Sequence, residues 1–484
     1  MMGEQRELKV IPLVDSFVGQ VTSAVNDDTA ACWSAVRYNA NNPWYVNTSN
    51  GNVNNNNSYN RYSLLPCPLS SVELLFSMML DAEVSCYKNK HSSLEACRIH
   101  YHLSELYKYA EAVYNEGLSV GRCKCFVLDY PVYREVFCAQ YFDRIMHHMI
   151  APLMSHIADV IHDKVGDISH GNRIGHSAFT AAMSIQDKLR KITNGWTEKA
   201  WVATRDYSGF FMSIPRKMAA DVFRKYAGMI LGLNDTVNSY LVDVVCLYLM
   251  TDPTKDCIRL SPISKWSYVP ENKSLFTSNP GHGLPIGNFP SQIMANLYRA
   301  VVDYFVNRIN GVECVVFVDD RMLCSRNQDT LKEAISLTEN RSNECGLVTN
   351  KRKCYMQQVD KGVKFCGYVI KCDRIYISNR VVKAAMRLLR LYDGCTDIQS
   401  EAKLAQRINS YIGLMSRTRS MKIQKKIMND VISKHKTLYF VSRNNHLVCR
   451  QKKKYTPLYT SIMNIEIFKH GVHWIQSYYK NMPM

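Results

Sequence analysis

The stretch Glu313-Cys-Val-Val-Phe-Val-Asp-Asp-Arg-Met-Leu-Cys-Ser325 decides the fold, because two adjacent acids interrupt a run of apolar and β-branched residues. Val315 to Val318 predicts one buried strand and Met322 to Cys324 begins another, which puts Asp319 and Asp320 at the tip of a tight strand-turn-strand. Adjacent ionised carboxylates on a packed sheet repel each other, so burying them requires a cation. A hard, oxygen-liganded ion such as Mg²⁺ is the natural partner. For these two residues alone, the alternative is a solvated hairpin turn.

The composition indicates a basic globular protein. Lys and Arg number 60 against 42 Asp and Glu, which gives a net charge of +18 and fits a polyanion partner, with a solvated basic surface as the alternative. No run of eighteen uncharged apolar residues appears, so no membrane span is expected. The first residues lack a secretory layout, and we expect a cytoplasmic protein. Its 17 cysteines, an odd number, are expected to be reduced and structural.

The first 120 residues predict an N-terminal extension. Residues 39–60 are rich in Asn with interspersed aromatics, which is typical of a loop or a ladder of turns. Such a segment is either a polar surface loop or a surface that stacks on nucleic acid bases. From Pro68 to Val120, apolar residues recur at three- and four-residue steps, which predicts helices that bury one face.

Two further segments carry candidate chemistry. Trp201 to Arg205 predicts a strand that ends at Asp206, and the chain then turns through Gly209 into a helix. An acid at a strand end is placed to share a cation with Asp319. The second segment, residues 279–292, concentrates glycine and proline before a helix that begins near Ser291. Such a backbone-rich loop can approach bases and sugars closely.

The order of these segments resembles the palm of reverse transcriptases. Asp206-x-x-x-Phe210-Phe211 resembles the first metal motif of that family, and Phe317-Val-Asp319-Asp320 resembles its Tyr-x-Asp-Asp box. The remaining matches are Gly283-Leu-Pro-Ile-Gly287-x-x-x-Ser291-Gln292, Asn350-x-x-Lys353, Phe365-x-Gly367 and the finger motifs Arg134-Glu135, Asp143-Arg144, His147-His148 and Asn172-Arg173-x-Gly175. The resemblance spans residues 125–375 and includes the bacterial enzymes of diversity-generating retroelements and of phage defence.

The resemblance implies an α+β right-hand polymerase, with fingers and a palm built from an antiparallel sheet plus helices, a helical thumb and an N-terminal extension. The expected regions are an N-terminal extension at 1–120 (the Asn-rich loop, then helices), fingers at 121–200, a palm with finger segments at 201–380 and a helical, basic thumb at 381–484. Basic residues recur throughout the last region, as expected of a domain that contacts phosphates.

The resemblance also implies the roles of individual residues. Asp206, Asp319 and Asp320 are the expected catalytic acids, and these three with the Tyr207 carbonyl are expected to bind two Mg²⁺ ions. The expected nucleotide contacts are Arg173, Phe211, Gln292 and Lys353, of which Phe211 would exclude a 2′-hydroxyl. The expected template and primer contacts are Gly283, Pro285, Gly287, Ser291, Phe317 and Gly367.

The sequence departs from the family pattern at three places. Phe317 replaces the usual Tyr of the box, and Arg321 follows the acids where an apolar residue is common. These changes bear on the contact to the primer end. Gly175-His-Ser replaces a Gly-Lys-Gly turn, which removes an expected lysine contact to the triphosphate and leaves Arg173 as the donor.

Three functional hypotheses follow from these motifs. The first is an RNA-directed DNA polymerase that copies a dedicated non-coding RNA in bacterial antiphage defence, with deoxynucleotides as substrates and DNA as product. The second assigns the same chemistry to mutagenic DNA synthesis by a diversity-generating retroelement. The third, of another class, is a non-catalytic RNA-binding scaffold, although a scaffold has no need of the three acids. Priming from a tyrosine and a homo-oligomeric state both remain open.

Overall fold

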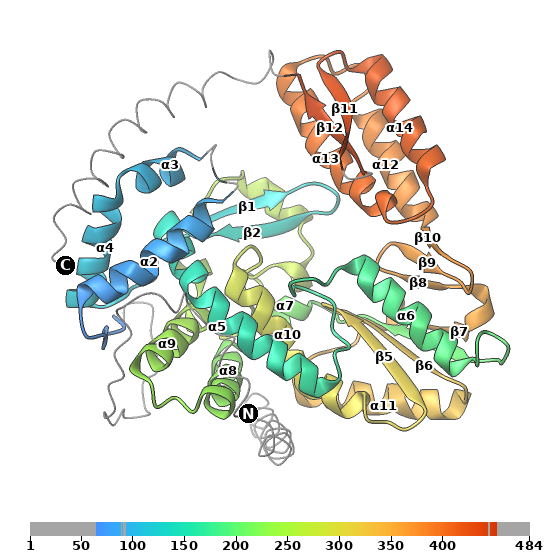
Figure 1. The fold of residues 1–484 in the computed structure, drawn as a ribbon, viewed down its shortest axis with the longest axis horizontal. Helices are drawn as coiled ribbons and strands as arrows, with labels where there is room; N and C mark the ends of the chain where they lie inside the picture. The colour runs from blue at the N-terminus through green and yellow to red at the C-terminus, as the bar shows by residue number, and fades with distance from the viewer. Residues whose placement is uncertain (1–63, 89, 91–92, 444–445, 453–484) are drawn as a thin grey trace.

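The structure, a computed structural model, describes residues 64–88, 90, 93–443 and 446–452 (Figure 1). The Asn-rich segment 39–60 therefore lies outside the described residues. Among the described helices, none has the length and apolar character that a membrane span requires. Every cysteine in the described ranges is a free thiol.

A four-stranded antiparallel sheet carries the two predicted acidic segments. Its strand order is β5-β6-β3-β7. Side chains alternate between its two faces, as the strand pleat requires: Val202 and Val315 face one hydrophobic cluster, whereas Ala203 and Val316 face another. The strands are β3 (Trp201–Arg205), β5 (Val312–Phe317), β6 (Asp320–Ser325) and β7 (Tyr355–Gln358).

Helices cover both faces of this sheet, which is why its strands are apolar on both sides. The α6 side chains share one cluster with β8 and β9, and α10 and α11 contribute to the other. Helix α10 follows the glycine- and proline-rich loop, as predicted, and almost all of its residues are buried. These helices are α6 (Ala178–Ile192), α7 (Phe210–Ser213), α8 (Arg216–Leu231), α9 (Thr236–Met250), α10 (Phe289–Val306) and α11 (Gln328–Glu344).

The N-terminal part of the described chain is helical, as predicted from its apolar spacing. Three helices pack with the long helix α5 into the same core as α8, α9 and α10. A hairpin of β1 and β2 precedes α5, and the short strand β4 pairs in parallel with β1. These elements are α2 (Val72–Tyr87), α3 (Leu94–Tyr101), α4 (Leu103–Glu116), β1 (Lys124–Leu128), β2 (Arg134–Cys138), α5 (Tyr141–Val165) and β4 (Ile258–Arg259).

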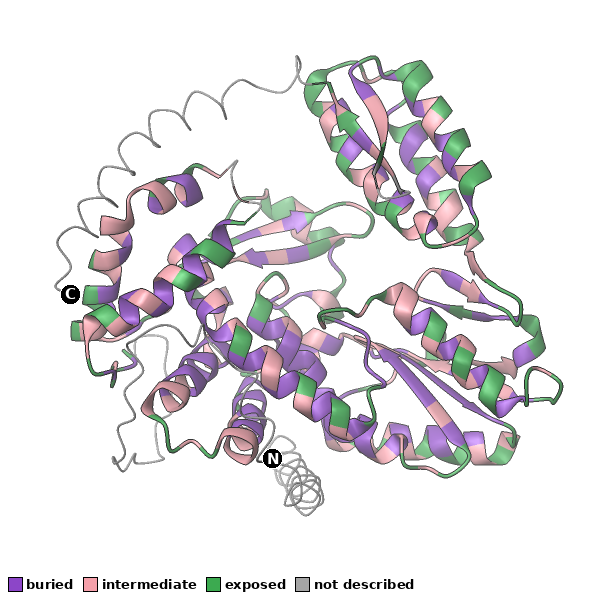
Figure 2. Cartoon of the chain, in the orientation of Figure 1, coloured by how far each residue is buried: buried purple, intermediate pink, exposed green. Residues whose placement is uncertain are grey.

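The C-terminal region contains a β-hairpin that the sequence analysis did not predict. Beyond Val381 we expected only helices, but β11 and β12 form an antiparallel pair whose buried residues join the core of α12–α14. Exposed residues alternate with buried ones along these helices (Figure 2), and Lys383, Arg387 and Lys426 are among the exposed. The elements are β8 (Val363–Phe365), β9 (Tyr368–Ile370), β10 (Ile375–Ile377), α12 (Asn379–Leu391), α13 (Ile398–Ser416), α14 (Met421–Lys434), β11 (Leu438–Arg443) and β12 (His446–Gln451).

The predicted α+β class is confirmed. Helices surround small, mostly antiparallel sheets, and the β1–β4 pair is a short parallel exception. In Figure 1, the α12–α14 helices stand apart from the main body, next to the loop that joins β1 and β2. The acid-bearing end of the β5-β6-β3-β7 sheet is where the candidate chemistry lies.

Candidate active site

The three acids of the predicted metal site lie at one end of the central sheet. Asp206 directly follows β3, Asp319 lies in the turn between β5 and β6, and Asp320 is the first residue of β6. Arg205 of β3 pairs with Arg321 of β6 in the antiparallel ladder. The residues that continue this ladder, Asp206 and Asp320, therefore come opposite each other. The fold thus brings together acids that lie far apart in the sequence.

Asp206 and Asp319 form a facing pair of carboxyl groups. Asp206 is 4% exposed, and Asp319 is half-buried. Burial raises the pKa of Asp319 above its ordinary value, and the neighbouring Asp206 carboxyl raises this pKa further. The positive charge of Arg299 acts in the opposite direction. Ionising both carboxyl groups is therefore costly unless a cation lies between them.

The Asp320 carboxylate has a different neighbour. The Cys366 thiol, in the turn between β8 and β9, donates to Oδ2 of Asp320 across 3.9 Å. Burial and then the Asp320 charge raise the pKa of Cys366, so this thiol stays protonated and remains a donor. Asp320 thus contacts the small β8–β9–β10 sheet, whereas Asp319 faces Asp206.

The oxygen donors at this end of the sheet fit a divalent cation. An isolated bridge joins Tyr207 to Thr349, and its hydrogen bonds use the Asp206 carbonyl and the Ser208 amide. The Tyr207 carbonyl is therefore not used by this bridge. In the described residues, no three His, Cys, Asp or Glu side chains are grouped to hold a metal. Two carboxylates and a carbonyl nevertheless suit Mg²⁺, which commonly takes one or two protein carboxylates and completes its shell with substrate phosphates and water.

The glycine- and proline-rich loop packs between the short helix α7 and the β1–β2 hairpin. The Gly283 amide donates to the Ile214 carbonyl across 2.8 Å, and the Leu284 amide donates to the Phe211 carbonyl across 2.9 Å. Gly287 has a φ of +115°, and a Cβ there would lie 2.5 Å from the Phe137 carbonyl oxygen. Pro285 lies between these contacts, which hold the loop against α7 before it and against β2 after it.

A cavity of about 710 Å³ lies beside Phe317, the last residue of β5. Phe317 and Gln292 line it, together with residues from α2, α5 and the 170–177 loop. Ser291 is buried in the first turn of α10, beside Gln292. Phe211 is half-buried, and its ring meets the edge of Phe210 with centroids 5.6 Å apart. The cavity thus adjoins the acid-bearing turn on the side of the N-terminal helices.

The sequence of this region matches one known family. Residues 131–370 match the family model described as reverse transcriptase (RNA-dependent DNA polymerase). The chain contains a reverse transcriptase domain. Such domains are RNA-directed DNA polymerases, a class of nucleotidyltransferases. The match covers the segment in which the sequence analysis found the family motifs.

Solved structures similar to this chain include telomerases. Apo telomerase from Candida tropicalis without its C-terminal domain aligns at 10% identity and a TM-score of 0.39, over 53% of this chain and 55% of the telomerase chain. The apo telomerase from Candida tropicalis aligns at 10% identity and a TM-score of 0.40, over 65% of this chain and 63% of the telomerase chain. Telomerase from Candida albicans in complex with a TWJ fragment of telomeric RNA aligns at 10% identity and a TM-score of 0.41, over 65% of this chain and 55% of the telomerase chain. This chain thus spans less than two thirds of each telomerase chain. No curated protein matches in sequence.

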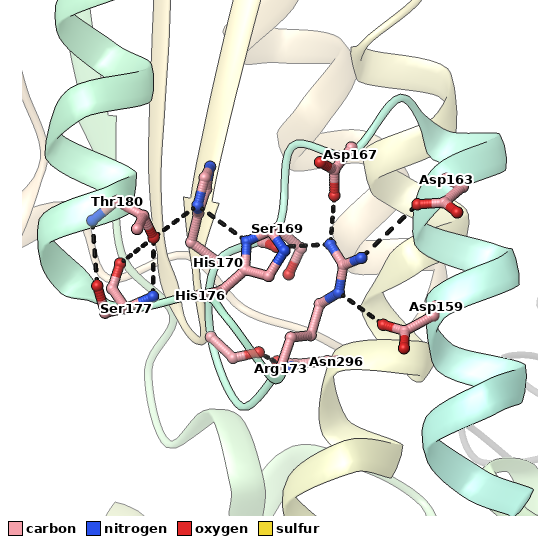
Figure 3. Close-up of polar contacts among 11 residues, drawn as sticks. Asp159, Asp163, Asp167, Ser169, His170, Arg173, His176, Ser177, Thr180 and Asn296 are labelled. Atoms are coloured by element: carbon pink, nitrogen blue, oxygen red, sulfur yellow. Dashed lines mark hydrogen bonds and ion pairs between the residues drawn. The ribbon is translucent and has the colours of Figure 1, made fainter.

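Within the reverse transcriptase domain, Arg173 lines the same cavity, and its guanidinium is paired with acids (Figure 3). Its guanidinium forms ion pairs with Asp159 at 3.2 Å, Asp163 at 3.7 Å and Asp167 at 2.5 Å, and only 7% of its side chain is exposed. Nη1 also donates to the Ser169 carbonyl across 3.0 Å. A contact between Arg173 and a triphosphate, as predicted, would require these ion pairs to open.

The last two predicted contact residues are Lys353 and Gly367. The Lys353 side chain lies outside the described residues. Gly367 has a φ of +86° in the β8–β9 turn, and its carbonyl accepts from the Ser378 amide across 2.9 Å. Gly367 therefore lies between the Cys366 thiol that contacts Asp320 and the start of α12.

The sequence analysis missed two charged residues of the reverse transcriptase domain. Arg299 and Asp303 lie on α10, are both fully buried and contact the acid-bearing turn or its neighbour Arg321. Their four-residue spacing on an otherwise apolar helix was the available signal, because charged residues are rarely buried unless they are paired.

Proposed function

We propose that this protein is an RNA-directed DNA polymerase whose catalytic acids are Asp206, Asp319 and Asp320. The observation that carries this proposal is the facing pair of carboxyl groups of Asp206 and Asp319, which lies within a reverse transcriptase domain. Both carboxyl groups lie at the end of a rigid sheet, and electrostatic catalysis requires such preorganised groups.

Each acid has its own part in this proposal. Asp206 and Asp319, with the Tyr207 carbonyl, would hold two Mg²⁺ ions, and Asp320 would support the pair from the β8–β9 side. When bound, the two ions activate the primer 3′-hydroxyl and neutralise charge on the triphosphate and the pyrophosphate leaving group. The protein otherwise acts by holding the two substrates in line.

We assign the surrounding residues to substrate positioning. Phe211 blocks the space of a ribose 2′-hydroxyl and so selects deoxynucleotides, and Gln292 and Lys353 contact the nucleotide. The ion pairs of Arg173 drawn in Figure 3 hold the 168–176 loop against α5, and Arg173 reaches a phosphate only if these ion pairs open. Template and primer contact Gly283, Pro285, Gly287, Ser291, Phe317 and Gly367.

A primer-extension assay tests the proposal. Purified protein is incubated with an RNA template, an annealed DNA primer, Mg²⁺ and one labelled deoxynucleotide. We expect the wild-type protein to extend the primer, and Asp319→Asn to abolish extension while RNA binding stays within about twofold, because the carboxylates act on the reacting groups and not on the duplex. Asp187→Asn makes the same chemical change at an exposed ion pair on α6 and serves as the control.

Two results would contradict the proposal. Full extension by Asp319→Asn would show that the acid pair is not the catalytic site. The absence of any product from the wild-type protein, together with tight RNA binding, would favour the non-catalytic scaffold. Folding of each variant is checked by circular dichroism, so that a loss of activity is not confused with a loss of structure.

We further propose that the template is a dedicated non-coding RNA and that the protein serves bacterial antiphage defence. The support is the N-terminal extension and the long basic C-terminal region, both of which exceed a compact retroelement enzyme. Sequencing the co-purified RNA and the DNA product tests this role. A template repeat matched to a variable repeat in a neighbouring gene would favour the diversity-generating alternative instead.

A further inference from the structure

Three charged side chains are buried together behind the acid-bearing turn. Arg299 and Asp303 are 0% exposed and Arg321 is 1% exposed. Nε of Arg299 donates to Oδ2 of Asp303 across 3.1 Å, and Nη2 of Arg321 donates to the other oxygen, Oδ1. Asp303 is therefore shared between two arginines, one on its own helix and one on β6. Burying three charges is costly, and replacing such groups by apolar residues is often neutral or stabilising.

This group holds the turn on both sides of its acids. Nη1 of Arg299 donates to the carbonyl of Val318, the residue before Asp319. Arg321 is the residue after Asp320, so its contact with Asp303 fixes the other end of the same four-residue segment. The shared carboxylate on α10 thus ties both ends of the turn to one rigid helix.

The backbone of the turn requires such support. Val318 has a φ of +54°, a conformation that a β-branched residue adopts only under constraint. The 168–176 loop also approaches it closely, because a Cβ added at Gly171 would lie 2.7 Å from the Val318 amide nitrogen. Asn296, one turn before Arg299 on α10, donates to the Gly171 carbonyl across 2.6 Å. Helix α10 therefore holds both the turn and the loop that faces it.

The group also reaches the strand that carries Asp206. The guanidinium carbon of Arg321 lies 5.8 Å from the centre of the Tyr207 ring, and Tyr207 directly follows Asp206. The Tyr207 hydroxyl in turn bonds to Ser342 Oγ of α11 at 2.8 Å. The three buried charged side chains thus contact or include Val318 and Arg321, which flank the Asp319–Asp320 pair, and they also contact Tyr207, which follows Asp206.

We propose that Arg299, Asp303 and Arg321 are positioning residues of the polymerase site, which hold the Val318–Arg321 turn so that Asp319 stays facing Asp206. This inference rests on the proposed function and explains why Arg321 stands where an apolar residue is common in the resembling family. None of the three side chains is expected to touch a substrate. Their contribution lies in the geometry of the carboxylates, and contacts of this kind commonly change metal affinity 10- to 100-fold.

The test replaces Arg299 and measures metal binding apart from turnover. Arg299→Gln loses the Val318 contact but leaves Asp303 and Arg321 to pair with each other. We expect Mn²⁺ binding, followed by electron paramagnetic resonance, to weaken about tenfold or more. We also expect kcat for primer extension to fall by a similar factor, with the KM for primer–template within about twofold of the wild type. A general loss of stability would not lower Mn²⁺ affinity and kcat while leaving the KM for primer–template unchanged.

Two further variants complete the design. Arg299→Lys keeps the charge and the pair with Asp303 but has no second arm for the Val318 carbonyl, so intermediate values are expected. This variant decides the outcome if Arg299→Gln does not fold. Arg224→Gln removes a different Arg–Asp pair, between α8 and α9, and should leave Mn²⁺ binding unchanged.

The inference is overturned if folded Arg299→Lys and Arg299→Gln both bind Mn²⁺ and turn over as the wild type does. This result differs from a failure of the proposed function, in which the wild-type protein itself extends no primer. Weakened Mn²⁺ binding in Arg224→Gln would also overturn it, because the effect would then follow from any lost ion pair.

Discussion

At the residue scale, Asp143 belongs to a family motif, and its contacts show a structural role. This carboxyl group is 3% exposed and accepts from the Tyr248 hydroxyl across 2.9 Å and from the Gly121 amide across 3.2 Å. Burial raises its pKa to about 6, against the two hydrogen bonds, which lower it. Asp143 lies within the Asp143-Arg144 motif, and its contacts join α5 to α9 and to the start of the β1 segment.

This raised pKa predicts the pH dependence of stability at one position. Because the folded pKa lies above the unfolded value, the folded state holds the proton more tightly, and stability falls as pH rises from about 4 to 6. Asp143→Asn removes the ionisation and keeps an acceptor. Its stability relative to the wild type should rise by about 1 kcal/mol between pH 5 and 7 and then level off, as measured by urea unfolding. A difference that does not change with pH would contradict this assignment.

At the element scale, the loop between η4 (Glu271–Lys273) and α10 depends on glycine at one contact in particular. The Phe137 amide donates to the Ile286 carbonyl across 2.8 Å, which draws the loop against β2 and leaves Gly287 no room for a side chain. Gly281 also has a positive φ, but nothing lies within 4 Å of its Cβ position. A substitution at Gly281 therefore meets only backbone strain, whereas a substitution at Gly287 meets backbone strain and a steric conflict.

We predict that Gly287→Ala is more damaging than Gly281→Ala. Both variants carry the cost of a positive φ, on the order of 1 kcal/mol, but only Gly287→Ala must also displace the Phe137 carbonyl. Gly287→Ala should lower the melting temperature further and reduce the primer-extension rate at least severalfold. Equal melting temperatures and rates for the two variants would show that the loop is not held against β2.

The same scale shows what the sequence could predict and why. The apolar run around residues 315–324 predicts a hairpin, and β5 and β6 form it. The turn itself differs, since Asp320 already belongs to β6 and Val318 takes the positive φ. Local propensity opposes that conformation, and contacts from Gly171 and Arg299, distant in the sequence, impose it. The conformation of this turn therefore cannot be predicted from the residues of the turn alone.

Two other features were readable but were missed. Leu438 to Val441 and Leu447 to Cys449 are apolar runs that flank an Asn-Asn pair, which is a hairpin signal, but the many basic residues around them led us to expect helices alone. Asp159, Asp163 and Asp167 recur at four-residue steps just before Arg173, and this spacing could have predicted that its guanidinium is paired.

At the scale of the whole molecule, the tip of the β1–β2 hairpin touches the C-terminal helices. The Tyr130 and Tyr411 hydroxyls lie 2.6 Å apart, and Arg407 of α13 pairs with Asp129 at 3.6 Å while lying over the Tyr130 ring. Tyr130 also packs against the core of α12–α14. This contact joins the β1–β2 hairpin, which we expect to belong to the fingers, to the helices that we expect to form the thumb.

We predict that weakening this contact strengthens duplex binding. If the contact must open to admit primer and template, Tyr411→Phe removes about 1 kcal/mol from the closed state. The apparent Kd for primer–template, measured by fluorescence anisotropy, should then fall up to about fivefold. Tyr439→Phe makes the same change on β11 and should have no effect. A higher Kd for Tyr411→Phe would instead mean that this hydroxyl supports the bound state.

The central claim is that Asp206 and Asp319, brought together at one end of the central sheet, act as one catalytic unit. Single-turnover incorporation of one deoxynucleotide by Asp206→Asn, Asp319→Asn and the double variant tests this most directly. We expect each single change to slow incorporation by roughly a thousandfold or more, and the double variant to be no slower than the worse single one. Losses that multiply in the double variant, or near-normal incorporation by either single variant, would contradict the claim.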